Sequence, residues 1–72
     1  MHDIRESSFE CRFDSASGRR MARIRAWDAQ EAVQLFVVEL RADGIDEAGE
    51  VVAAPVSGGR RSRARVPRHR AA

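Results

Sequence analysis

The segment DAQEAVQLFVVELRADG, residues 28–44, carries the clearest structural signal in the chain. It begins as a capping box, because the Asp28 side chain can accept from the Glu31 amide while the Glu31 side chain reaches back to the amide of residue 28. Apolar residues then recur at the 3.6-residue spacing of an amphipathic helix, and Gly44 is typical of the position just past a helix end. We therefore expect a helix that fills this segment and ends near Asp43. The stripe expected to face the core comprises Ala29, Ala32, Val33, Phe36, Val37 and Leu40.

Two stretches of alternating residues precede the helix. Over residues 8–14 and again over residues 21–27, apolar side chains alternate with polar ones, which is the period of a half-buried strand. The intervening residues 14–18, DSASG, have the composition of a turn. Two such strands joined by a short loop predict an antiparallel hairpin.

A third strand is predicted after the helix, at the valine-rich residues 50–56, where Pro55 favours a sheet edge or an early end. The expected fold class is therefore α+β: a three-stranded antiparallel sheet in β-β-α-β order, with strand order 2-1-3 and one amphipathic helix on one face. We expect residues 1–7 to be a flexible N-terminus, 8–56 to be a small domain, and 57–72 to be a basic C-terminal tail without a core of its own. The side chains expected under the helix are Phe9, Cys11, Phe13, Ala22, Ile24, Ala26, Val52 and Ala54.

Length and composition exclude several classes of function. A chain of 72 residues buries only a thin core, and no motif for nucleophilic, metal or phosphate chemistry occurs in it. We therefore expect no enzyme activity, no cofactor and no metal site. Cys11, the single cysteine, lies on the core face of its strand and is expected to be a buried thiol.

No apolar run approaches the roughly 18 residues of a membrane span, and the start of the chain has no apolar leader. These observations predict no membrane contact and a cytoplasmic location.

Charge is segregated along the chain, which has a formal net charge of +2. Residues 28–56 carry seven acids against Arg41 alone, and residues 57–72 carry six arginines and no acid. Leu35 and Val38 lie roughly opposite the core stripe of the helix, where an apolar line rimmed by acids suits a protein partner with a basic groove. A homodimer built on the same line is an alternative. The predicted partner-binding residues are Glu31, Leu35, Val38, Glu39, Asp43, Asp46 and Glu47.

The arginines support nucleic-acid binding as a further alternative. Arg23, Arg25 and Trp27 share the outer face of the predicted hairpin, and arginines around an aromatic ring can hold single-stranded nucleic acid by phosphate contacts and base stacking. The tail arginines can neutralise phosphates without any fold. The residues assigned to this alternative are Arg23, Arg25, Trp27, Arg60, Arg61, Arg63 and Arg65.

In size, strand-strand-helix-strand pattern and divided charge, residues 9–56 resemble the small anti-CRISPR proteins of phages and mobile elements, above all those that act on type I systems. That group has no shared signature, so the resemblance assigns no individual residue. It implies a non-enzymatic inhibitor that occupies a surface of a CRISPR surveillance complex in the cytoplasm of a bacterial host cell. The acidic side of the helix fits a basic DNA channel on such a complex, whereas the arginine-rich tail departs from that picture. This inhibitor is the leading expectation from the sequence, with nucleic-acid binding as its rival.

Overall fold

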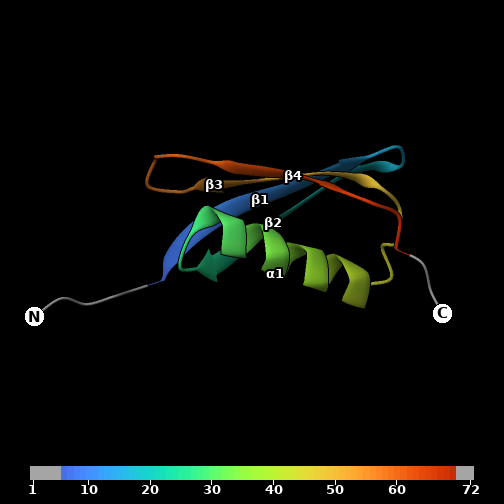
Figure 1. Ribbon diagram of the computed structural model, residues 1–72, viewed down its shortest axis with the longest axis horizontal. Coiled ribbons are helices and arrows are strands. Elements are labelled where there is room, and N and C mark those ends of the chain that lie inside the picture. The colour runs from blue at the N-terminus through green and yellow to red at the C-terminus, as the bar shows by residue number, and fades with distance from the viewer. Residues whose placement is uncertain (1–5, 70–72) are drawn as a thin grey trace, which may run out of the picture.

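A computed structural model describes residues 6–69, in which one helix lies across one face of a four-stranded antiparallel sheet (Figure 1). Most of the N-terminal segment 1–7, predicted to be flexible, lies outside the described residues. The strand order is β2-β1-β3-β4, so the α+β class and the relative order of the first three strands are confirmed. The prediction of only three strands is wrong. The elements are β1 (Ser7–Ser15), β2 (Gly18–Ala26), α1 (Ala29–Ala42), β3 (Gly49–Pro55) and β4 (Ser62–Val66).

The extra strand, β4, forms inside the region predicted to be a tail without a core. Ala64 and Val66 face the helix, and Val66 is only 5% exposed, whereas Arg63 and Arg65 project from the other face. The helix side of β4 contains only two apolar residues, Ala64 and Val66, so the alternation typical of a strand is not evident in the sequence. Pairing with β3 supplies the backbone hydrogen bonds that such a short strand requires.

β3 is an internal strand, so the first predicted consequence of Pro55, a sheet edge, is wrong. The alternative, an early end, describes one side of the strand, because pairing between β3 and β4 ends at Ala53. Pro55 pairs only with Phe9 of β1, and its missing N–H therefore interrupts no bond to β4.

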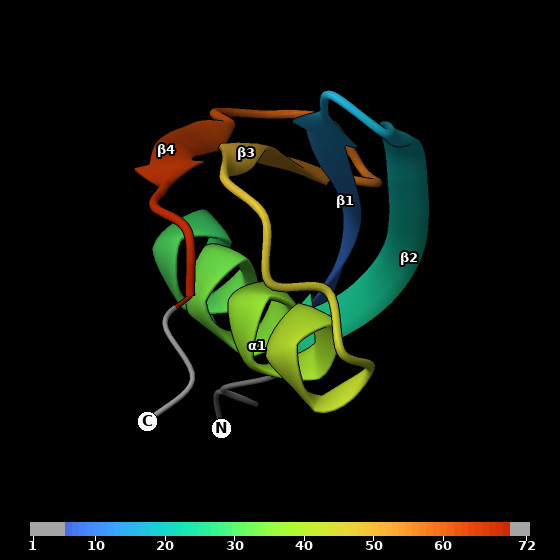
Figure 2. The same ribbon diagram turned by 90° about the vertical axis from the view of Figure 1, so that its right-hand side faces the viewer.

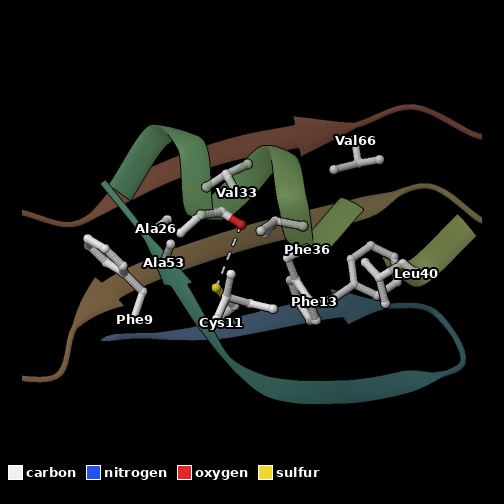
Figure 3. Close-up of a cluster of buried hydrophobic side chains, with 12 residues drawn as sticks. Phe9, Cys11, Phe13, Ala26, Val33, Phe36, Leu40, Ala53 and Val66 are labelled. Carbon is white, nitrogen blue, oxygen red and sulfur yellow. Dashed lines mark hydrogen bonds between the residues drawn. The ribbon is translucent and has the colours of Figure 1, made fainter. Parts of the chain in front are cut away.

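The register of β3 differs by one residue from the expected core. Val51 lies opposite Phe13, so Val51 and Ala53 face the helix, while Val52 and Ala54 face away from it. Four consecutive apolar residues fit either face equally well, and the pattern alone cannot select the register. The remaining core follows the prediction, with α1 packed over the buried side chains of β1 and β2 (Figure 3).

The ends of α1 confirm the predicted helix limits. Asp28 Oδ1 accepts a hydrogen bond from the Glu31 amide at 2.8 Å. Glu31 Oε1 accepts from the amide of Trp27 at 2.7 Å, one residue before the partner expected in a capping box. Asp43 is the C-cap residue, and Gly44 follows with a φ of +84°, a conformation that favours glycine.

Arg41, the single base of the acidic segment, ties the chain that follows β4 to the end of the helix. Its guanidinium donates to the carbonyls of Ile45 and Pro67, each at 2.6 Å. The backbone N–H of His69 donates to the carbonyl of Asp46 at 2.7 Å. These bonds bring the segment after β4 down beside the helix, as Figure 2 shows, and fix the position of β4.

Candidate nucleic-acid interface

The sheet face that is turned away from the helix is rich in arginine. Strand alternation sends every second residue to this side, and the register aligns them in rows, with Glu10 opposite Arg23 and Val52 opposite both Arg12 and Arg63. Arg61, which precedes β4, shares a hollow on this side with Arg12. We call this surface the arginine face; its seven arginines and three carboxylates give a net charge of +4. Its charged members are Arg12, Arg19, Arg23, Arg25, Arg61, Arg63 and Arg65, with Glu10, Asp14 and Glu50.

Two carboxylates of the arginine face hold arginines in place. Asp14 binds the Nε atoms of both Arg12 and Arg19, at 2.8 and 2.6 Å. The hydrogen bond from Arg19 is the main cause that lowers the pKa of Asp14, so this carboxylate stays ionised at neutral pH. Glu10 pairs with Arg23 at 3.2 Å. Exposed pairs of this kind add little stability, and their effect is to orient the guanidinium groups.

Other arginines of this face form no close ion pair with an acid of the described residues. Within residues 6–69, no acid lies within 4.0 Å of the guanidinium groups of Arg25, Arg61 and Arg65. Arg63 reaches Glu50 only at 3.9 Å. Most of the unpaired charge therefore belongs to the segment that the sequence suggested was a tail.

The centre of the arginine face is apolar. Val52 is 5% exposed although it points away from the helix, because its neighbours cover it. Its cross-strand neighbours are Arg12 and Arg63, whose aliphatic stems can cover the Val52 side chain. Met21 lies opposite Arg12 and is well exposed beside this centre.

Two residues of the predicted nucleic-acid set lie elsewhere. Trp27 follows the end of β2 and lines a shallow hollow with Gln30, Glu31 and Gln34 of the helix, not with Arg23 and Arg25. Arg60 lines a second hollow beside the helix start, together with Asp28 and its neighbour Arg61. The structure thus gathers Arg23, Arg25, Arg63 and Arg65 on one face, with Arg61 at its edge between the two hollows, and places Trp27 and Arg60 beside the helix start.

The predicted partner-binding residues are spread along α1 and its connector. Leu35 and Val38 are 40% and 65% exposed, which confirms the apolar line opposite the core. Glu39 and the C-cap residue Asp43 are also exposed along the helix, and Glu31 lies at its first turn.

Asp46 and Glu47 make contacts within the fold and do not border the apolar line of Leu35 and Val38. The carbonyl of Asp46 accepts from His69, as described above, and the Glu47 carboxylate accepts from the Ser17 hydroxyl at 2.5 and 2.6 Å. The hydroxyl of Ser17 is the main cause that lowers the pKa of Glu47. Glu47 therefore fastens the connector to the turn between β1 and β2.

The buried thiol of Cys11 matches its prediction. The side chain is fully buried, and its Sγ contacts the carbonyl oxygen of Ala32 at 3.9 Å (Figure 3). Burial first, and the charge of Glu39 second, raise the pKa of Cys11 to about 11, so the thiol is neutral and poorly reactive. Within residues 6–69 no group of three or more potential metal ligands occurs, and no helix there is long and apolar enough to cross a membrane.

Sequence reasoning placed Arg12 near Arg23 and Arg25, but it missed Arg19 as a member of the arginine face and Arg41 as the anchor of the C-terminal segment. Arg19 had a usable signal, because the strand parity that exposes Arg23 also exposes it. Arg41 had none, since its carbonyl partners lie up to 26 residues away in the chain. No family model, no curated protein and no solved structure matches this chain.

Proposed function

We propose that this protein binds nucleic acid through the arginine face. The observation that carries the proposal is that Arg63 and Arg65 of β4, with Arg61 just before the strand, share a surface with Arg23 and Arg25. Two arginine groups that are separate in the sequence become one basic surface with a net charge of +4. Because phosphate neutralisation supplies most of the affinity of such surfaces, a fixed array of this kind suits a polyanion better than a disordered tail does.

The salt dependence of binding tests the proposal quantitatively. Four net charges engaged with phosphates predict a slope of about −3.6 in log affinity against log salt, or a loss of about a hundredfold between 50 and 200 mM. A labelled oligonucleotide titrated with the full chain, and followed by fluorescence anisotropy, measures this slope.

A matched pair of triple variants separates the face from bulk charge. R61Q/R63Q/R65Q removes three charges from the arginine face and should reduce the salt slope to about −1. R20Q/R60Q/R68Q removes the same charge elsewhere: Arg20 lies opposite Phe13 on the helix side of the sheet, and Arg60 lies beside the helix start. The second variant should keep most of the slope. Equal losses in the two variants would show that only net charge matters and would contradict the proposal.

The inhibitor suggested by the sequence is the second candidate. It is favoured by the exposed apolar line of Leu35 and Val38 beside Glu39 and Asp43. In this proposal the acidic helix side blocks a basic surface of a CRISPR surveillance complex, without catalysis. Leu35→Glu should then abolish co-elution with a purified type I complex while the protein stays folded, and Arg25→Gln should leave co-elution unchanged. Wild-type co-elution of the folded Leu35→Glu variant would exclude this surface.

A further inference from the structure

The arginine face has a pattern across the sheet as well as a net charge. Six of its seven arginines lie on or next to the two outer strands, and its three carboxylates all lie on the inner strands β1 and β3. We call the two outer rows the β2 rail and the β4 rail. The β2 rail is Arg19, Arg23 and Arg25, and the β4 rail is Arg61, Arg63 and Arg65.

The spacing of the two rails follows from the strand order. β2 and β4 are separated by β1 and β3, so three interstrand steps of about 4.8 Å put the rails about 14 Å apart. Between them lie Arg12, the three carboxylates, which together give this centre a net charge of −2, and the covered apolar side chain of Val52. A single phosphate backbone is therefore disfavoured along the centre, whereas two backbones are favoured along the sides.

B-form DNA presents two phosphate backbones at a comparable separation, since its major groove is about 12 Å wide between them. The sheet curls around the helix, so the arginine face is convex (Figure 2). A convex surface with a basic rail on each side can straddle a groove, with each rail against one backbone.

The positions of the aromatic residues also favour a duplex over a single strand. Single strands are held largely by stacking of bases on aromatic side chains. Phe9, Phe13 and Phe36 are buried in the core, and Trp27 lies beside the helix, so none of the four aromatic residues is on the arginine face.

We infer that the ligand of the arginine face is duplex DNA, gripped by the β2 rail on one backbone and the β4 rail on the other; this inference rests on the proposed function. The centre of the face holds one arginine, Arg12, beside three carboxylates and the covered Val52, so it has few donors to read base edges. The contacts are then mainly to phosphates, and binding should show little dependence on base sequence.

Two measurements with the full chain test the inference. In the first, duplex DNA, single-stranded DNA and duplex RNA of equal length compete for the protein at 50 mM salt. We expect duplex DNA to bind at least about tenfold more tightly than the single strand, whose charge density is half as great. Comparable or tighter binding of the single strand or of duplex RNA overturns the inference but leaves the proposed function standing. Failure of all three to bind removes the proposed function itself.

In the second measurement, the rails are neutralised one at a time. R19Q/R23Q/R25Q and R61Q/R63Q/R65Q should each lower the affinity for duplex DNA and each reduce its salt slope, because both backbones are contacted. R20Q/R60Q/R68Q is the control of equal charge, and circular dichroism checks that every variant is folded. Loss of slope on neutralising one rail only would show a single-backbone path and contradict the two-rail grip.

Discussion

Replacement of Arg41 by Met tests whether the C-terminal segment belongs to the folded domain. Methionine keeps much of the aliphatic stem but removes the hydrogen bonds to the carbonyls of Ile45 and Pro67, both 2.6 Å long, and the longer one to Glu47 at 3.3 Å. Hydrogen bonds from a charged donor contribute about 1.5–3 kcal/mol each, and partial exposure of this site places its bonds at the lower end. From the two short bonds we expect the free energy of unfolding to fall by about 3 kcal/mol.

Thermal unfolding followed by circular dichroism measures this loss. For a domain of this size, each 1 kcal/mol corresponds to about 4–8 °C, so Arg41→Met should lower Tm by about 12–24 °C. Arg68→Met is the control, because Arg68 is exposed and should change stability by less than about 0.5 kcal/mol. Hydrogen exchange should also show reduced protection at the amide of His69. If the two variants unfold at the same temperature, Arg41 does not anchor the segment and this account of β4 is refuted.

Three further predictions concern the core and the helix. Because the folded-state pKa of Cys11 is raised to about 11, the contribution of its neutral thiol to stability is complete below about pH 9 and is lost as pH rises to about 11. Urea titrations should show the free energy of unfolding fall by up to about 1.4 kcal/mol per pH unit in this range. Since the chain has no tyrosine or lysine, Cys11→Ala should remove that fall. Gly49→Ala should destabilise the fold by about 1–3 kcal/mol in urea unfolding, because a Cβ there would overlap the Phe13 ring and the Asp14 carbonyl; an unchanged midpoint would show that the strand shifts freely. Asp28→Ala should cost about 1 kcal/mol through the lost N-cap, and Asp28→Asn, which can still accept from the Glu31 amide, should restore most of it.

The parts of the fold that could be predicted are those with one unambiguous period. The helix has a capping residue, an apolar stripe and a terminal glycine, and the first two strands alternate cleanly, so local physics alone determines them. β3 is different, because Val51 and Val52 are equally apolar and only the pairing with Phe13 selects which one faces the core. β4 was missed because its stability comes from partners distant in the sequence, namely the free edge of β3 and the guanidinium of Arg41.

The candidate site also has parts that local sequence patterns predict and parts that depend on the tertiary fold. Strand parity alone placed Arg23 and Arg25 on an outer face, and helical spacing placed Leu35 and Val38 in solvent. The arginine face as a whole could not be predicted, since it depends on β4 joining the sheet. Trp27 was expected beside Arg23 from simple alternation, but the strand ends at Ala26 and the chain turns into the helix at Asp28.

An NMR titration of the isotopically labelled full chain with duplex DNA locates the binding surface residue by residue. The largest chemical-shift changes should fall on the outward residues of β2 and β4 and on Arg61, including the guanidinium groups of Arg25, Arg61 and Arg65. Leu35 and Val38 on the far side of the molecule should not change. Changes concentrated on Leu35, Val38 and their neighbours, or no saturable change at 50 mM salt, would contradict the proposed binding of duplex DNA by the arginine face.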